Sequence, residues 1–555
     1  MTRDLTPRSR RGWQLVAAGV AASSLLFLTA CSGDAAGDEA GLDNTEGSMT
    51  DFAADQQFKA TEPVDFSILW TDWPELPIKD SWQLFDEIEK RTNVTLKPTN
   101  IPFSDATEKR SLLISAGDAP QIIPLVYTGE DAPFVSSGAV LPMSDYVDLM
   151  PNFQKYVEEW DLGAMIDNLR QDDGKYYMVP GLQEVSVPVF SMIVRKDVFD
   201  EAGAEIPETW DELRVALEKI KEKHPDSYPL ADGFEGQSML NYAAHAFGTV
   251  AGWGFGNGTF WDEEAGEYVY AATSDGYKEM VEYFHGLAED GLLDPESFTA
   301  KSDGSTADLS EKVANNAVFA TSGASGTVAE FQTALEAADP DAEYELVQIA
   351  PPGGPAGQVV EPRNFWHGFM ISAEAQDDPH FVALIQFLDW LYYSPDAREM
   401  LRWGIEGETY TRADDGTITI NPEYSLDAYN INPDGKTDLA KDLGFSTFLA
   451  ESTESRELKE SYNSDQFVEY MDRVLETRTP RDPFPPAPLD EAELEQSSLL
   501  STPLKDTVET NTLKFILGDR PLSEWDAFVA ELEGQNLQGY LDLVNGAQKR
   551  FAENN

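Results

Sequence analysis

An alternation of strand-like and helix-like segments near the start of the chain most constrains its fold. Residues 64–70 are apolar in the manner of a buried strand, residues 81–92 carry large apolar side chains at helical spacing, and residues 94–97 have strand character again. A second helix is expected over 104–116 and a third strand over 121–126. Strand, helix, strand, helix, strand is the pattern of an open parallel α/β sheet. The sequence therefore predicts an α/β fold.

The length of the chain requires more than one hydrophobic core. A single core stops growing at about 250–300 residues, and this chain has 555. Hydrophobic residues make up 41% of it and include twelve tryptophans, which is enough apolar material for packed globular lobes. We therefore expect at least two lobes.

The charge of the chain excludes some classes of partner. The net charge is −61, and a surface this negative repels phosphate backbones, so we expect no nucleic acid partner. The same field disfavours a strongly anionic ligand unless a local basic site overrides it. The single cysteine rules out an internal disulfide framework and a thiolate metal site.

The N-terminus has the parts of a secretory signal peptide. Four arginines lie within residues 3–11, and an uncharged stretch, residues 12–30, follows them. An uncleaved membrane anchor is the alternative, although this stretch is barely long enough to span a bilayer and is padded with small residues. We expect residues 1–30 to be the signal peptide, and no later stretch is long and apolar enough to span a membrane.

The residues that follow this stretch indicate a lipid anchor. Leu28-Thr29-Ala30-Cys31 resembles the lipobox of bacterial lipoproteins, which implies that the Cys31 thiol is diacylated and becomes the mature N-terminus. A buried structural cysteine is the alternative. Residues 32–61 are rich in Gly, Ala, Asp and Glu, so we expect residues 31–61 to form a lipidated flexible tether. The resemblance places the protein at the extracellular face of the cell membrane.

Several blocks in fixed order resemble a known family. Residues 137–146 (SGAVLPMSDY), 173–180 (DGKYYMVP) and 194–213 (with VRKDVFD and PETWDEL) are similar to blocks of the extracellular solute-binding proteins of bacterial ATP-binding-cassette (ABC) importers. Residues 401–410 and 518–525 resemble the LipO-like group of larger solute-binding lipoproteins, which is associated with sugar import. The resemblance covers essentially the whole mature chain.

The resemblance implies an architecture and a function. The expected fold is the two-lobed periplasmic-binding-protein-like fold of type II, in which each lobe is an open mixed sheet flanked by helices, with a hinge and extra C-terminal helices. It implies a monomer that captures a carbohydrate, above all an oligosaccharide, by hinge closure and delivers it to a membrane permease. The expected lobes are residues 62–184 plus 316–368 and residues 185–315 plus 369–555.

Signatures of catalysis are absent from the sequence. None of the five histidines forms an H-E-x-x-H pair, G-x-S-x-G does not occur, and no segment matches a calcium-binding EF-hand loop. We therefore expect a protein that is not an enzyme and holds no cofactor or metal. A glycosidase carboxylate pair cannot be recognised among 100 acidic residues. A surface glycoside-processing enzyme thus stays open as an alternative, as does a peptide-binding or structural lipoprotein.

Candidate ligand-binding residues follow from the chemistry of sugars. Aromatic rings stack on the C–H faces of a sugar, and polar side chains bond its hydroxyls. Ligands of open α/β sheets bind beyond the carboxyl ends of the strands. The residues that meet both tests are Asp72, Trp73, Tyr127, Thr128, Gln183, Glu184, Trp253, Trp261, Arg363, Asn364, Trp366 and Glu406.

A structural role competes at several of these positions. Trp73 and Trp253 are equally compatible with the cleft and the core, Arg363 can serve as an ion-pair partner, and Glu406 can belong to a turn. Five other tryptophans lie in a strand or on apolar helix faces and are expected in the core: Trp70, Trp82, Trp210, Trp390 and Trp525.

Overall fold

The computed structural model describes residues 41–252, 258–299, 307–341 and 343–554. The expected signal peptide, the expected lipidation site Cys31 and the candidate Trp253 lie outside these residues. No helix in the described part of the chain is both long enough and apolar enough to cross a membrane.

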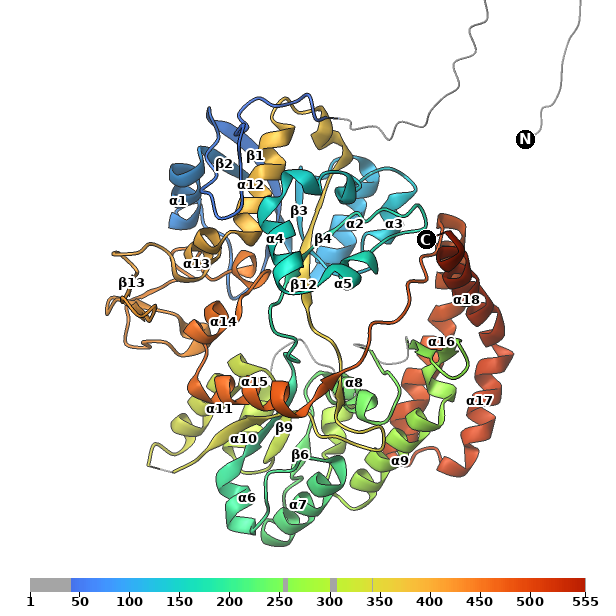
Figure 1. The fold of residues 1–555 in the computed structure, drawn as a ribbon. Coiled ribbons are helices and arrows are strands. Elements are labelled where there is room, and N and C mark those ends of the chain that lie inside the picture. Colours follow the sequence, from blue (N-terminus) through green and yellow to red (C-terminus); the bar gives the residue numbers. More distant parts are fainter. Residues whose placement is uncertain (1–40, 253–257, 300–306, 342, 555) are drawn as a thin grey trace, which may run out of the picture. The chain divides into compact units, whose positions relative to one another are not determined.

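The first lobe is built on a five-stranded sheet with strand order β2-β1-β3-β12-β4 (Figure 1). β1 pairs in parallel with β2 and β3, whereas β12 is antiparallel to β3 and β4. The helices α1 (Gln83–Thr92) and α2 (Ala106–Ala116) connect its first strands, which confirms the expected alternation. The strands are β1 (Val64–Asp72), β2 (Val94–Pro102), β3 (Ile122–Val126), β4 (Val179–Leu182) and β12 (Phe365–Ile371).

The core of this lobe surrounds the helix α12 (Phe381–Tyr393). Every residue of α12 is buried, as its apolar character on all sides requires. Trp70 and Trp82 pack edge to face at 5.9 Å in the same core. The five tryptophans expected in the core are all 5% exposed or less, so that expectation is confirmed.

The segment before β1 belongs to this lobe. The Phe58 side chain is fully buried and lies 6.1 Å from the ring of Phe387 on α12. The backbone N–H of Met49 donates a hydrogen bond to the Gln386 side chain at 2.9 Å. The expectation of a flexible tether is therefore wrong for residues 41–61. A few apolar side chains dock this segment on α12 despite its polar composition.

The second lobe is built on a four-stranded sheet with strand order β10-β5-β9-β6. β5 is antiparallel to both neighbours, and β6 is parallel to β9. The strands are β5 (Ser191–Arg195), β6 (Leu230–Ala231), β9 (Ala320–Gly323) and β10 (Leu346–Ile349), and the main helices of the lobe are α6 (Lys196–Ala202), α7 (Trp210–Lys223), α8 (Gln237–Ala246), α9 (Asp275–Glu289), α10 (Ala307–Ala314) and α11 (Ser325–Ala338).

Three C-terminal helices complete the second lobe, as expected. They are α16 (Glu491–Leu517), α17 (Trp525–Gly534) and α18 (Leu537–Asn554), and α16 packs on α9 (Figure 1). Their apolar residues, among them Phe515 and Phe528, share one core with Trp210.

The expected lobe boundaries are wrong in two places. β9 pairs within the second sheet, although residues 316–368 were expected in the first lobe. Residues 369–371 of β12 pair within the first sheet, although residues 369–555 were expected in the second lobe. The order of apolar segments along the chain does not specify which sheet a strand joins, because pairing depends on distant partners.

Over the described residues, the chain passes between the lobes at 183–190, 350–364 and 462–465. The third passage is a further departure from the expected boundaries. It separates α14 (Arg456–Tyr462), which packs on the first core, from α15 (Asp465–Thr477), which packs on β10.

The remaining elements are short helices and two-stranded ribbons. They are α3 (Ala132–Val135), α4 (Pro151–Glu159), α5 (Gly163–Asp167), α13 (Pro395–Trp403), β7 (Thr259–Asp262) with β8 (Glu267–Tyr270), β11 (Val359–Val360) with β17 (Thr479–Pro480), β13 (Tyr410–Arg412) with β14 (Ile418–Ile420), and β15 (Tyr424–Ser425) with β16 (Thr437–Asp438).

Candidate functional site

Two adjoining cavities lie where the chain passes between the lobes. The first encloses about 570 Å³ and the second about 650 Å³. Both are lined by Pro188 and Val189 of one passage and by Arg363 and Trp366 near the end of another. The two cavities therefore meet at the Arg363–Trp366 pair, and we call them the first and the second cavity.

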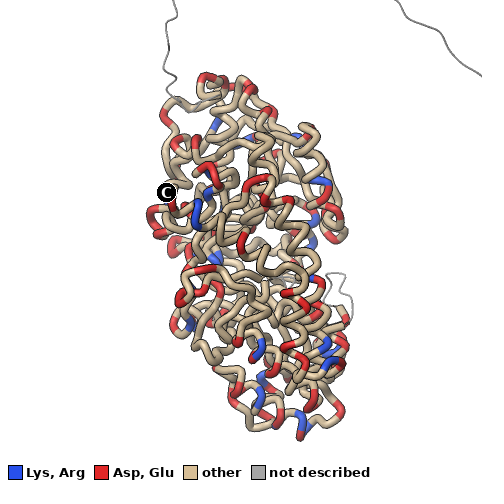
Figure 2. Tube along the Cα trace, turned by 90° about the vertical axis from the view of Figure 1, so that its right-hand side faces the viewer, with Lys and Arg blue, Asp and Glu red and all other residues tan. Residues whose placement is uncertain are grey.

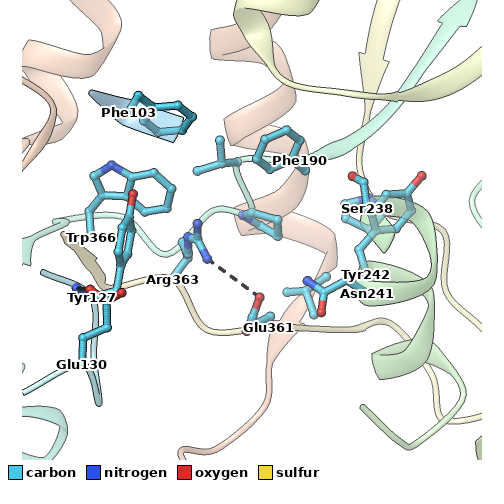
Figure 3. Close-up of a pocket in the computed structure, with 14 residues that line it drawn as sticks. Phe103, Tyr127, Glu130, Phe190, Ser238, Asn241, Tyr242, Glu361, Arg363 and Trp366 are labelled. Carbon is cyan, nitrogen blue, oxygen red and sulfur yellow. Dashed lines mark hydrogen bonds and ion pairs between the residues drawn. The ribbon is translucent and has the colours of Figure 1, made fainter. Parts of the chain in front are cut away.

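The first cavity is lined mainly by aromatic side chains. Phe103 and Tyr127 are 55% and 43% exposed, which is unusual for residues this apolar. In Figure 3 they lie with Trp366 on one side of the cavity, and Tyr242 lies with Ser238 and Asn241 on the other. The first group comes from the first lobe and the second from α8 of the second lobe. A ligand in this cavity thus meets ring faces from both lobes.

Arg363 is held in place between these groups. Its guanidinium carbon lies 4.3 Å from the centre of the Trp366 ring, in cation–π geometry. One of its terminal nitrogens is 4.0 Å from a carboxylate oxygen of Glu361 (Figure 3). Its Nε is buried and has no hydrogen-bond partner among the described residues. The side chain as a whole is 28% exposed and borders both cavities, so its terminal N–H groups are the donors that a ligand can engage.

A network of charged residues lines the second cavity. The Lys459 ammonium donates to the Gln183 side-chain oxygen at 2.6 Å and lies 3.6 Å from a carboxylate oxygen of Glu454. Arg402 bonds the same carboxylate at 3.1 Å. Although burial acts to raise the pKa of Glu454, the positive charges of Lys459 and Arg402 lower it below the ordinary value. Glu454 is thus held in its charged form.

Four of the predicted residues line the cavities. Tyr127, Arg363 and Trp366 border the first, and Gln183, Arg363 and Trp366 border the second. The ring of Tyr127 meets that of Trp366 edge to face at 5.7 Å. The structure therefore brings these four residues together, although they come from three distant parts of the sequence.

Four other candidates have structural partners beside the site. The Asp72 carboxylate accepts the Ile78 N–H at 2.7 Å, and the Glu184 carboxylate accepts the Arg456 N–H at 2.6 Å. The Asn364 carbonyl accepts the Gln183 N–H at 2.8 Å. Trp73 stacks on Phe103 with ring centres 5.2 Å apart, so it supports a wall of the first cavity from behind.

The remaining candidates lie outside both cavities. Thr128 is exposed beyond the lining. Trp261 sits on the β7–β8 ribbon and packs edge to face on Tyr268 at 5.5 Å. Glu406 is exposed and borders a separate cavity, together with Arg412.

Sequence reasoning missed several lining residues. Phe103 follows the end of β2 as Trp73 follows the end of β1, so the same signal would have found it. Phe190 lies in a passage between the lobes. Asn241, Tyr242 and Lys459 lie on helices, where their spacing is that of ordinary helical side chains. No local pattern distinguishes them.

Comparison with known protein families shows the family to which the chain belongs. The family profile of bacterial extracellular solute-binding proteins matches residues 83–404, which is more than half of the chain. The chain therefore belongs to this family, as the sequence blocks indicated.

Curated relatives agree with this assignment. The chain is 28% identical to the fructooligosaccharide ABC transporter substrate-binding protein FusA of Streptococcus pneumoniae over 232 residues, which cover 39% of this chain and 42% of FusA. It is 23% identical to the polygalacturonan/rhamnogalacturonan-binding protein YtcQ of Bacillus subtilis over 350 residues, covering 62% and 66%. It is also 23% identical to lipoprotein LipO of Bacillus subtilis, covering 62% and 67%. The matches to FusA and YtcQ thus span less than two thirds of those proteins.

Solved structures share the fold over nearly the whole described chain. The alginate-binding protein AlgQ2 without calcium superposes with a TM-score of 0.66 at 17% identity, covering 89% of this chain and 99% of that one. FusA of Streptococcus pneumoniae with kestose gives a TM-score of 0.62 at 20% identity, covering 88% and 100%. This likeness is one of fold, and it confirms the expected two-lobed architecture.

Proposed function

We propose that the chain is the substrate-binding component of an ABC transporter, which captures an oligosaccharide in the two cavities and delivers it to a membrane permease. The observation that carries this proposal is the set of aromatic rings that open into the first cavity from both lobes. Aromatic faces stack on sugar C–H patches, and the neighbouring amide and hydroxyl groups suit sugar hydroxyls. The named ligands of the relatives include fructooligosaccharide and polygalacturonan.

The size of the cavities favours a chain of sugars over a single one. Each cavity alone falls within the range of about 300–1,000 Å³ typical of small-molecule sites. Because the two adjoin at Arg363 and Trp366, they suit a ligand with several units in line.

Capture works through hinge closure. A ligand that touches Tyr127 and Trp366 of the first lobe and Tyr242 of the second stabilises the arrangement in which the lobes enclose it. The three passages between the lobes serve as the hinge. The closed, loaded form then docks on the permease as a monomer, and no bond is made or broken.

A lipid at Cys31 holds the protein at the extracellular face of the cell membrane. Attachment is by the acyl chains alone. Replacing Cys31 with Ser should move the protein from the membrane fraction to the soluble fraction on centrifugation. Unchanged attachment of Cys31→Ser would overturn the proposed anchor while leaving the binding function intact.

A ligand panel tests the proposed function. The purified protein is incubated with oligosaccharides and with peptides, and the melting temperature and the integrity of each compound are measured. We expect at least one oligosaccharide to raise the melting temperature and to be recovered unchanged. Hydrolysis of a glycan would favour the glycoside-processing enzyme instead. A shift with peptides alone would favour a peptide-binding lipoprotein.

A further inference from the structure

We propose that the cleft selects an uncharged oligosaccharide and discriminates against chains of uronic acids. This inference rests on the proposed function, because it names the chemical class of the ligand that the two cavities take. The fold alone does not distinguish the two kinds of sugar, since they share ring faces and ring hydroxyls and differ at C6, where a uronic acid has a carboxylate in place of the hydroxymethyl group.

The walls of the two cavities are predominantly acidic. Two carboxylates line the first cavity and five line the second. Among the described residues, the basic side chains that line either cavity are Arg363, Lys441 and Lys459. A uronic acid chain would bring one negative charge per unit into this lining.

Each of these cations already faces a carboxylate. The Lys441 ammonium lies 2.8 Å from Asp427, and the Lys459 ammonium lies 3.6 Å from Glu454. Both carboxylates line the same cavity as their partners. A uronate that approached either cation would therefore meet a like charge at close range, and like charges at such distances repel.

Arg363 is the cation best placed to meet a ligand. Its side chain is 28% exposed, and Glu361 lies 4.0 Å from one of its terminal nitrogens in the same cavity. A sugar hydroxyl can accept a hydrogen bond from a terminal N–H of Arg363 while the contact with Glu361 persists. A uronate would instead compete with Glu361 for the single positive charge. The arrangement thus favours a neutral acceptor.

The field of the whole chain acts in the same direction. The net charge is −61, and in the view of Figure 2 acidic residues are spread along both lobes. A field of this sign lowers the local concentration of an anionic polymer near the cleft.

Matched pairs of sugars test the inference. One pair is galacturonic acid oligosaccharides before and after complete methyl esterification, which share a backbone and differ in charge. A second is mannuronate against mannose oligosaccharides, and fructose, xylose and maltose oligosaccharides extend the uncharged set. Binding is measured by calorimetry at low and high sodium chloride.

We expect every tight binder to be uncharged, with an affinity that changes by less than about twofold with salt. Tighter binding of a uronate than of all uncharged sugars, weakened by salt, would overturn the inference while supporting the proposed function. Failure of every sugar to bind would overturn the proposed function and this inference with it.

A pair of variants tests the part assigned to Glu361. Glu361→Gln removes the counter-charge of Arg363, so we expect the affinity for galacturonic acid oligosaccharides, relative to that for the uncharged ligand, to rise by about tenfold. Glu406→Gln removes one negative charge outside both cavities and should leave both affinities unchanged. Equal uronate affinities in the two variants would overturn the role of the Arg363–Glu361 pair.

Discussion

Two buried arginines hold in place a short segment that lines the second cavity. Arg398 donates hydrogen bonds to the backbone carbonyls of Leu449, Ala450 and Thr453, at 2.6, 2.6 and 2.7 Å. Arg402 bonds the carboxylate of Glu454 and is fully buried. These contacts hold the short segment that presents acidic side chains to the cavity.

Removing Arg398 should destabilise the first lobe strongly. Arg398→Met removes three hydrogen bonds from a buried charged donor and leaves the Thr453 carbonyl without its partner, so we expect the free energy of unfolding in urea to fall by about 3–5 kcal/mol. Arg456→Met is the control, since Arg456 pairs with Glu460 and Asp472 while its side chain is 36% exposed. Its cost should be within about 1 kcal/mol. Equal losses in the two variants would contradict this account.

A buried histidine gives the protein a defined dependence on pH. His245 on α8 is 4% exposed, and neither ring nitrogen has a partner among the described residues. Burial lowers its pKa from 6.5 to about 4. Because the folded pKa lies below the unfolded one, the unfolded state binds a proton first as the pH falls. The associated stability is complete above pH 6.5 and is lost between pH 6.5 and about 4.

His245→Phe should remove the part of the pH dependence of stability that comes from this histidine. Between about pH 7.5 and pH 4.5, we expect the wild-type protein to lose up to about 2–3 kcal/mol of unfolding free energy relative to the variant. Urea unfolding at the two pH values measures this difference. Parallel pH profiles of the two proteins would refute the assignment.

At the scale of elements, the sequence predicted those whose pattern is local. The order β1-α1-β2-α2-β3 was predicted because strand and helix periods alternate within short windows. The placement of β9 and β12 was not, since a strand's neighbours in a sheet are distant in sequence. The same limit applies to the site. Tyr127 follows β3 and Trp366 lies near the start of β12, and both were predicted, whereas Tyr242 is one helical residue among many.

The segment 41–61 is another element whose placement depends on residues distant in the sequence. Its composition resembles a linker, yet its burial on α12 makes it part of the first core. Phe58→Ala should therefore reduce the free energy of unfolding by about 3–5 kcal/mol, the usual cost of such a cavity. Lys59→Ala, at an exposed neighbouring position, should stay within about 0.5 kcal/mol. Urea denaturation distinguishes the two, and an unaffected Phe58→Ala would restore the view of this segment as a tether.

At the scale of the whole molecule, the proposed function depends on a site that neither lobe provides alone. Tyr127 and Trp366 follow or begin strands of the first sheet, and Tyr242 lies on α8 of the second lobe. The passages between the lobes run through the same place. One ligand can thereby couple the two lobes.

Calorimetric titration of the protein with the best sugar of the panel tests this claim most directly. Trp366→Ala is compared with Trp261→Ala, which changes a half-buried tryptophan outside both cavities. We expect one sugar ligand per chain for the wild-type protein. Affinity should fall by at least about tenfold in Trp366→Ala and by less than about twofold in Trp261→Ala. Undiminished binding by Trp366→Ala would contradict the assignment of this cleft as the sugar site.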